Sequence, residues 1–326
     1  MSKIALAIHG GAGTILRSSM TPELEAEYRG GLESALKVGW EILSKTGSAL
    51  DAVEATTCSL EDFHLFNAGR GSVFTHEGKN EMDASIMDGA RLKAGAVAFV
   101  KNVRNPIKLA RLVMERTEHI LLAGDGANQF AKQMNVDFED DAYFFTQHRY
   151  DQLLKAREEG VVELDHTADE AEILSEPAAS AAGQKANSDS AKGTVGAVAC
   201  DSQGNLAAAT STGGMTNKKF GRIGDTALIG AGTYADDVCA VSCTGHGEYF
   251  MLGVTAYDVA ARMKYKGISL EKAAKDSIDF LTSIKGEGGL IAVDAKGNFT
   301  MPFNSDGMYR GCVDADGKIT VEIYRD

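Results

Sequence analysis

Residues 193–212 have the sequence GTVGAVACDSQGNLAAATST, and this stretch is the most informative part of the chain for the fold. Two runs of small apolar residues, 194–201 and 205–212, each have the length of a buried strand. The Ser-Gln-Gly-Asn segment between them is typical of a turn that joins antiparallel strands. The stretch therefore predicts a buried β-hairpin that begins abruptly at Gly193-Thr194.

The chain just before the hairpin has a different composition. Residues 165–192 are rich in Ala, Ser, Asp and Glu and contain no Phe, Trp or Tyr. Such a segment cannot bury enough apolar surface to offset the entropy that is lost when it becomes ordered. We therefore predict a flexible linker over about 165–192, which ends where the hairpin begins.

Similar signals occur along the rest of the chain. Short apolar runs and turn residues predict strands or hairpins over 3–8, 71–87, 92–100, 119–124, 227–234, 239–245, 288–304 and 318–324. Capping residues and helical periodicity predict helices over 22–44, 48–60, 106–116, 147–159, 247–263 and 269–283, with another after Asp125. Because strands cluster in each half and flank paired helices, the pattern favours a layered α+β protein with mainly antiparallel sheets over a parallel doubly wound fold.

Charge and composition restrict the classes of partner and compartment. The 326 residues carry a formal net charge of -13, which disfavours binding to phosphate backbones and anionic membranes, so no nucleic acid or membrane partner is expected. The first apolar run is too short for a secretory signal or a membrane span. The five cysteines show no metal-ligand spacing, and a reducing cytoplasm fits them best.

The Gly193-Thr194 pair is a candidate site of self-cleavage. If the bond between them breaks, Thr194 gains a free α-amine beside its own hydroxyl. An α-amine has a pKa of about 8, so part of it is neutral near pH 7 and can act as the base for that hydroxyl. Gly193 lacks a Cβ and tolerates the strained geometry that attack on its carbonyl needs. Taken alone, such a pair is more often an ordinary start of a strand.

Longer motifs accompany this pair. The chain contains GTVGAVA, ATSTGGMTNKKFGRIGDTALIGAGTYA and CTGHGE in its second half, and AIHGGAG, LFNAGRGSVFT and MDASIMDG in its first. With these motifs in this order, nearly the whole chain except the linker resembles the plant-type L-asparaginase / isoaspartyl peptidase family of N-terminal nucleophile hydrolases. The resemblance implies one domain over 1–326 with a four-layer αββα sandwich. It also implies cleavage into an α chain of 1–193 and a β chain of 194–326, which associate as (αβ)2.

The resemblance assigns catalytic roles by position. Thr194 matches the nucleophile, and Thr212 matches a threonine whose hydroxyl contacts it. Thr244 and Gly245 match the oxyanion-hole donors, through a hydroxyl and a backbone N–H respectively. Asn67 lies in a family loop near the active site. Two donors that point at a developing oxyanion stabilise the transition state, and a covalent acyl-enzyme on Thr194 is expected.

Substrate recognition is expected to fall to a neighbouring pair. Arg222 and Asp225 match residues that bind the α-carboxylate and the α-ammonium of the substrate, and Gly245 and Gly247 match glycines beside them. An arginine fork fits a carboxylate in its plane, and a nearby aspartate balances an ammonium. Without the resemblance, Arg222 and Asp225 would more often be a surface ion pair. The implied substrates are L-asparagine and β-aspartyl dipeptides.

No cofactor is expected for catalysis, but the resemblance implies a structural sodium ion in the loop at about 60–70. Its ligands would be main-chain carbonyls, so a change of side chain in this loop matters little. The implied ligands are the carbonyls of Leu60, Glu61, Phe63, Phe66, Ala68 and Arg70.

Two alternatives stay open at this stage. A glycosylasparaginase-like hydrolase would use similar machinery, although CTGHGE and the missing secretory signal argue against it. An unprocessed, inactive relative that binds a small molecule is the other, although Gly193-Thr194 together with Thr212 and Arg222 argues against that. His246 stands where some relatives have a small hydroxyl residue, and we expect it to influence substrate preference.

Overall fold

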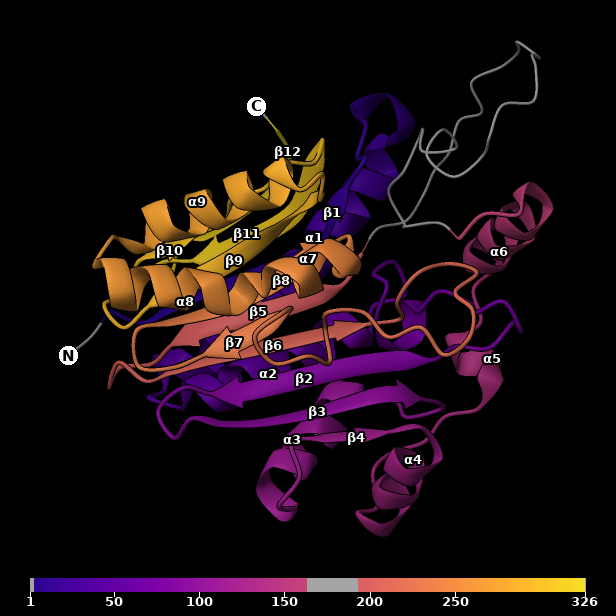
Figure 1. The fold of residues 1–326 in the computed structure, drawn as a ribbon, viewed down its shortest axis with the longest axis horizontal. Helices are drawn as coiled ribbons and strands as arrows, with labels where there is room; N and C mark the ends of the chain where they lie inside the picture. The colour runs from indigo at the N-terminus through magenta and orange to yellow at the C-terminus, as the bar shows by residue number, and fades with distance from the viewer. Residues whose placement is uncertain (1–2, 163–192, 326) are drawn as a thin grey trace.

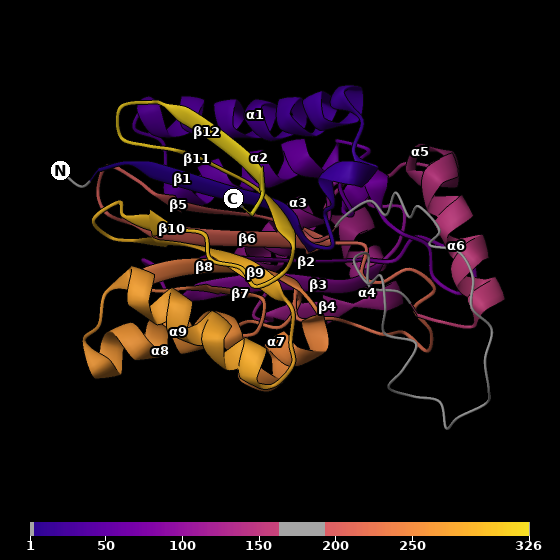
Figure 2. The same ribbon diagram turned by 90° about the horizontal axis from the view of Figure 1, so that it is seen from above.

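The computed structural model describes residues 3–162 and 193–325. The predicted linker over 165–192 lies outside the described residues. The rest forms a mixed α/β structure in which two sheets lie face to face, with helices on their outer sides (Figures 1 and 2).

The larger sheet has eight strands, and the hairpin of 193–212 lies at its centre. In the order in which they pair, the strands are β12 (Ile319–Tyr324), β11 (Gly307–Val313), β1 (Ala5–Gly13), β5 (Val195–Cys200), β6 (Leu206–Thr212), β2 (Met82–Asp88), β3 (Lys93–Val100) and β4 (Leu121–Ala123). All of these pairs are antiparallel except β3 with β4. The predicted hairpin is thus confirmed, and so is the mainly antiparallel character of the sheets.

The smaller sheet has four antiparallel strands, in the order β10 (Phe299–Thr300), β9 (Gly288–Asp294), β8 (Cys239–Gly245) and β7 (Thr233–Ala235). Small apolar side chains fill the space between the two sheets. Ala7, Val198 and Ala208 of the larger sheet and Ala240 and Ile291 of the smaller one belong to the same buried cluster. Short side chains let the two sheets approach closely over this area.

Helices cover both outer faces (Figure 2). The larger sheet is covered by α1 (Pro22–Ser44), α2 (Ala49–Glu61) and α3 (Pro106–Arg116), and the smaller sheet by α8 (Thr255–Lys266) and α9 (Leu270–Ser283). The remaining helices are η1 (Arg17–Ser19), η2 (Gly69–Gly71), α4 (Gly124–Gln133), α5 (Asp141–Phe144), α6 (Gln147–Glu159) and α7 (Gly247–Gly253). No helix in the described part of the chain is both long and apolar enough to cross a lipid bilayer.

Local signals located the helix starts correctly. The hydroxyl of Thr21 accepts from the backbone N–H of Leu24 at 3.2 Å, and Pro22 opens α1. The hydroxyl of Ser48 accepts from the N–H of Asp51 at 3.1 Å and so caps α2. Each hydroxyl satisfies an N–H group that the helix itself leaves without a partner.

Three predicted elements differ in the structure. The hairpin predicted over 71–87 is wrong, because β2 begins only at Met82 and forms its hairpin with β3. The residues before β2 turn locally, with the N–H of Thr75 donating to the carbonyl of Lys79. The strand predicted over 227–234 is reduced to its end, because the N–H groups of Leu228 and Gly232 donate to the carbonyl of Asp225.

The helix predicted over 247–263 is interrupted. Val254 has a φ of 45°, in the left-handed region, and this residue separates α7 from α8. Strand β11 was not predicted as a separate element, although its run GMYRGCV is buried throughout. The charged Arg310 interrupts the apolar pattern of this run, so the sequence did not indicate a strand. In the structure Arg310 is buried and donates to the carbonyls of Met308 and Tyr324.

Candidate active site

A cleft that is partly open to solvent lies where β5 begins and β6 and β8 end. Every residue predicted for catalysis, substrate binding or cleavage lines this cleft, except Thr244. Gly214, Met215, Gly224 and Thr226, which the sequence did not single out, line it as well. Residues that are far apart in the chain are thus brought together at one edge of the two sheets.

Strand pairing explains how the two central threonines meet. In the β5–β6 ladder Val195 is opposite Ser211, so the next pair outward is Thr194 and Thr212. The hydroxyl of Thr194 donates to that of Thr212 at 3.0 Å. The backbone N–H of Gly214 donates to the same Thr212 oxygen, also at 3.0 Å. The position of Thr212 is therefore held by the turn that follows β6.

Gly193 has a backbone conformation that favours glycine. Its φ is 62°, in the left-handed region that residues with a Cβ rarely adopt. The residue is buried and lines the cleft next to Thr194. Replacement of Gly193 by any residue with a side chain would therefore strain the backbone at the proposed cleavage point.

At the end of β8, a hydroxyl and a glycine lie next to each other. Thr244 is buried, and its hydroxyl has no hydrogen-bond partner among the described residues. Gly245 has a φ of 139°, and a Cβ there would collide with the carbonyl of Glu287. A buried hydroxyl without a partner is costly unless a ligand or water satisfies it. These two neighbours are thus suited to act as donors to a bound oxygen.

Arg222 has a partner that the sequence did not suggest. Its Nε and one terminal nitrogen donate to the two carboxylate oxygens of Glu248, at 2.8 and 2.7 Å. This pairing uses one edge of the guanidinium, which has five N–H donors in all. The side of the guanidinium near Gly224 and Gly247 borders the cleft, where a Cβ on either glycine would come within 3.0 Å of a terminal nitrogen. Arg222 is thus held in place by Glu248 and still presents donors to the cleft.

Asp225 is buried rather than part of a surface ion pair. Burial raises the pKa of its carboxyl to about 7, and the nearby Arg222 opposes this shift only partly. One carboxyl oxygen has no partner among the described residues. The other lies on the cleft side, where a Cβ on Gly247 would come within 2.7 Å of it. A cation in the cleft would relieve the cost of ionising this group.

Asn67 joins the first half of the chain to the site. Its amide nitrogen donates to the carbonyl of Gly214 at 2.7 Å, and its amide oxygen accepts from the N–H of Val73 at 3.0 Å. The N–H of Gly213 donates to its backbone carbonyl. Because Asn67 is only 1% exposed, its main contribution is to hold the turn after Thr212.

The loop at about 60–70, which was predicted to bind sodium, contains Asn67. A Cβ at Gly69 would collide with the carbonyl oxygen of Glu61, and one at Gly71 with that of Phe66, so both carbonyls point to bare glycines. The carbonyls of Leu60, Phe63, Phe66 and Ala68 each accept a backbone hydrogen bond, which leaves a second lone pair on each oxygen. Within the described residues, no cluster of three or more His, Cys, Asp or Glu side chains could hold a metal.

Sequence reasoning missed the roles of two residues at the site. His9 was quoted only as part of the AIHGGAG motif, but its Nδ1 lies 2.9 Å from the carbonyl oxygen of Thr194. Glu248 was noted only as part of a motif. In both cases the contact joins residues far apart in the chain, so no local spacing could have revealed it. His246 lies at the same rim, 3.5 Å from the Glu248 carboxylate.

The chain is similar to known proteins over nearly its whole length. Residues 2–323 match the asparaginase family. The chain is 46% identical to an isoaspartyl peptidase of Escherichia coli (strain K12), over all of this chain and 98% of that protein. It is 43% identical to an isoaspartyl peptidase/L-asparaginase of Xenopus laevis, over 99% of this chain and 96% of that one. It is 41% identical to a plant-type L-asparaginase of Pyrococcus abyssi, over 94% of each chain. The chain belongs to the asparaginase family of hydrolases.

Proposed function

We propose that this protein cleaves itself between Gly193 and Thr194 and then hydrolyses L-asparagine and isoaspartyl dipeptides with Thr194 as its nucleophile. The observation that carries the proposal is the contact of 3.0 Å between the hydroxyls of Thr194 and Thr212, in a cleft that Arg222 and Asp225 also line. The names of the relatives support the same two substrate classes.

The chemistry follows from the groups around the cleft. The α-amine of Thr194 takes the proton of its own hydroxyl, and the oxygen attacks the side-chain carbonyl carbon of the substrate. The Thr244 hydroxyl and the Gly245 N–H donate to the oxygen that becomes negative. The amide nitrogen leaves as ammonia, or as an amino acid, after it receives the proton, and an ester on Thr194 remains. Water activated by the same amine then opens the ester and releases L-aspartate.

Arg222 and Asp225 would orient the substrate. The α-carboxylate would bind the donors of Arg222 that border the cleft, and the α-ammonium would bind the buried carboxyl of Asp225, helped by the Gly247 carbonyl. The position of one Asp225 oxygen on the cleft side and the raised pKa of the carboxyl support this role, because a bound ammonium would stabilise the ionised carboxyl.

The cleaved protein would stay together as one Ntn-hydrolase domain. Strand β1 of the α chain (1–193) lies between β5 and β11 of the β chain (194–326), so both chains share one sheet. The order helices, sheet, sheet, helices supports the four-layer αββα sandwich of N-terminal nucleophile hydrolases. Assembly as (αβ)2, a sodium ion held by the carbonyls of the 60–70 loop and a cytoplasmic location belong to the same proposal.

Thr194→Ala tests this function. The variant removes the attacking hydroxyl, so intact mass should show one chain of about 34.5 kDa, and asparagine hydrolysis should be lost. Thr194→Ser is the matched control, because it retains the hydroxyl and should cleave slowly. A Thr194→Ala protein that still splits between residues 193 and 194, or still releases ammonia at the wild-type rate, would show that another group is the nucleophile.

A further inference from the structure

A row of polar side chains crosses the otherwise apolar space between the two sheets. It consists of His9 on β1, Ser242 on β8, Thr210 on β6, Thr233 on β7 and Ser85 on β2, and we call it the hydroxyl chain. All five residues are fully buried. Buried polar groups in such a place are retained at a cost unless each one is paired.

Consecutive members of the hydroxyl chain are within hydrogen-bond distance. His9 Nε2 lies 2.8 Å from the Ser242 oxygen, which lies 2.7 Å from the Thr210 oxygen. Thr233 lies 2.5 Å from Thr210 and 2.7 Å from Ser85. At the other end of the chain, His9 Nδ1 lies 2.9 Å from the carbonyl oxygen of Thr194. The hydroxyl chain therefore ends on the backbone of the proposed nucleophile.

The direction of these hydrogen bonds follows by elimination. The Thr194 carbonyl can only accept, so His9 Nδ1 must carry a proton and donate to it. Burial lowers the pKa of His9 to about 3, so the ring is neutral and Nε2 must accept from the Ser242 hydroxyl. Ser242 has then used its only proton, so Thr210 donates to Ser242 and Thr233 donates to Thr210. The protons of Thr233, Thr210, Ser242 and His9 thus point toward Thr194, while the Ser85 hydroxyl also lies 2.6 Å from the carbonyl oxygen of Thr226, which can only accept.

The backbone leaves room for this arrangement. The β1–β5 ladder ends with His9 opposite Gly196, which follows Thr194 by two residues in the chain. Beyond that point the imidazole, and not the strand, makes the contact from β1 to the Thr194 carbonyl. A Cβ at Gly196 would collide with both the His9 ring and the Ser242 hydroxyl, so the glycine is needed for the pair to form.

We propose that His9, held by the hydroxyl chain, is a positioning residue that fixes the carbonyl of Thr194 and thereby the orientation of its hydroxyl toward Thr212. The inference rests on the proposed function, because it takes Thr194 as the nucleophile. After cleavage Thr194 is a chain end, and a new N-terminus lacks the covalent restraint of a preceding residue. A fixed carbonyl restrains rotation of this terminal residue and keeps the hydroxyl in the geometry for attack.

The test compares two substitutions of His9 that each retain one of its two contacts. His9→Asn places an amide nitrogen near the position of Nδ1 and keeps a donor for the Thr194 carbonyl. His9→Gln places its amide near the position of Nε2 and keeps only the Ser242 side. We expect kcat per processed chain to fall roughly 10- to 100-fold in His9→Gln, with KM nearly unchanged. We expect kcat of His9→Asn to stay much closer to that of the wild-type protein. The rise of kcat/KM with pH that is expected from the α-amine of Thr194 should persist in both variants, because the proposed base is that amine and not His9.

Ser85→Ala is the control for a merely structural effect. It removes a buried hydroxyl from the far end of the hydroxyl chain and should lower the melting temperature without a comparable loss of kcat. Equal losses of kcat in Ser85→Ala and His9→Gln, or wild-type kcat in His9→Gln, would overturn the positioning role. If His9→Gln does not fold, Ser242→Ala carries the test, with a several-fold lower kcat at unchanged KM expected and an unchanged kcat against the proposal.

Thr194→Ala, assayed in parallel, separates this inference from the proposed function. If Thr194→Ala is inactive while His9→Gln keeps wild-type kcat, only the positioning role fails. If Thr194→Ala remains active, the nucleophile assignment itself fails. Mass spectrometry of each variant gives the processed fraction, so a defect in self-cleavage is not mistaken for a defect in turnover.

Discussion

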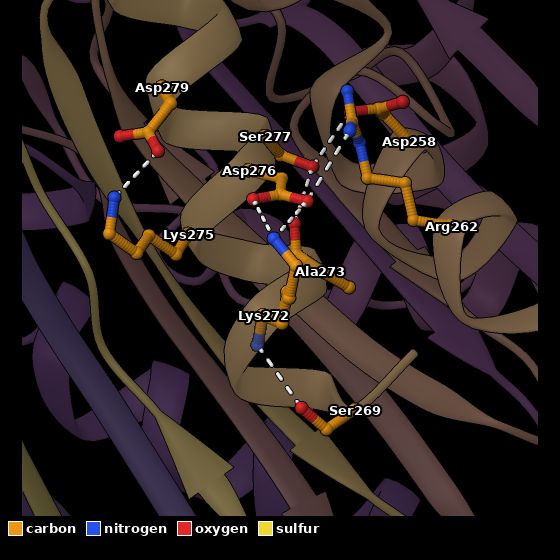
Figure 3. Close-up of polar contacts among 9 residues, drawn as sticks. All are labelled: Asp258, Arg262, Ser269, Lys272, Ala273, Lys275, Asp276, Ser277 and Asp279. Carbon is orange, nitrogen blue, oxygen red and sulfur yellow. Dashed lines mark hydrogen bonds and ion pairs between the residues drawn. The ribbon is translucent and has the colours of Figure 1, made fainter. Parts of the chain in front are cut away.

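The hydroxyl chain between the sheets and the charged surface of α8 and α9 use polar side chains in opposite ways. Figure 3 shows the polar contacts of α8 and α9. On α9, Lys272 pairs with Asp276 at 2.9 Å and Lys275 with Asp279 at 2.6 Å, each four residues apart on one helix. Both lysines are largely exposed. In the hydroxyl chain each member comes from a different strand, and all are buried.

Burial decides what each set contributes. Water competes for the exposed pairs on α9, so breaking one of them changes little. The members of the hydroxyl chain are fully buried, and an unpaired buried group costs the desolvation of that group. One contact combines a buried and a partly exposed group. Ser277 of α9 is buried and donates to Asp258 of α8 at 2.7 Å. Asp258 also accepts from Arg262. Similar hydrogen-bond lengths therefore do not imply similar free energies.

The largest effect is expected at the cleft, where Arg222→Lys replaces a planar fork by a point charge. Self-cleavage should be normal, but kcat/KM for asparagine should fall roughly 10- to 200-fold. This corresponds to a loss of about 1.5–3 kcal/mol of transition-state stabilisation. Steady-state kinetics on the processed protein measure this loss. Glu248→Gln is the matched control: it keeps Arg222, weakens only the group that holds it, and should raise KM a few-fold. Wild-type kcat/KM in Arg222→Lys would show that the carboxylate binds elsewhere.

Thr210→Val tests the buried side of the comparison directly. The side chain keeps its shape, but Ser242 and Thr233 each lose a partner. We expect the free energy of unfolding to fall by about 1–3 kcal/mol. Urea unfolding should be measured in the uncleaved Thr194→Ala background, so that each variant unfolds as one chain. A change near zero would mean that water reaches these hydroxyls and that burial is not what distinguishes them.

The buried carboxyl of Asp225 makes the stability of the protein and its affinity for a ligand depend on pH. Its pKa is raised by burial from 3.8 to about 7, so the stability that its neutral form contributes is fully present below about pH 3.8 and lost as the pH rises through about 7. A bound ammonium group offsets the free-energy cost of ionising the buried Asp225 carboxyl. L-aspartate should therefore raise the melting temperature more at pH 7.5 than at pH 5.5, with an affinity that grows by up to about tenfold per pH unit below the pKa.

Asp225→Asn should remove this pH dependence, because the amide does not titrate. Thermal melts with and without L-aspartate at the two pH values provide the measurement. An aspartate-induced shift in the wild-type protein that is equal or smaller at pH 7.5 would argue that Asp225 does not bind the ammonium.

The smallest effect is expected on the exposed face of α9. Lys275→Gln breaks the pair with Asp279, and it should leave kcat/KM unchanged and shift the melting temperature by no more than about 1 °C. Differential scanning calorimetry against the wild-type protein checks this. A loss as large as that of Thr210→Val would remove the distinction between the exposed and the buried networks.

The sequence by itself determined the features that depend on residues close together in the chain. The 193–212 hairpin and the caps at Thr21 and Ser48 were predicted from runs and spacings of a few residues, whereas the roles of Thr194 and Thr212 came from the resemblance of whole motifs to a known family. Their physical basis is local, since a cap or a turn is satisfied by backbone groups two to four positions away. The lysine–aspartate pairs of α9 belong to this class as well.

Only the tertiary structure decided which distant residues complete the site. His9 meets Thr194 across 185 positions of sequence and Ser242 across 233, and Glu248 reaches Arg222 across 26. Such contacts depend on which strands are neighbours and on how the two sheets are stacked, and no periodicity along the chain encodes them. The same holds for the pKa of Asp225, which is set by burial and therefore exists only once the surrounding strands and turns have closed around the carboxyl.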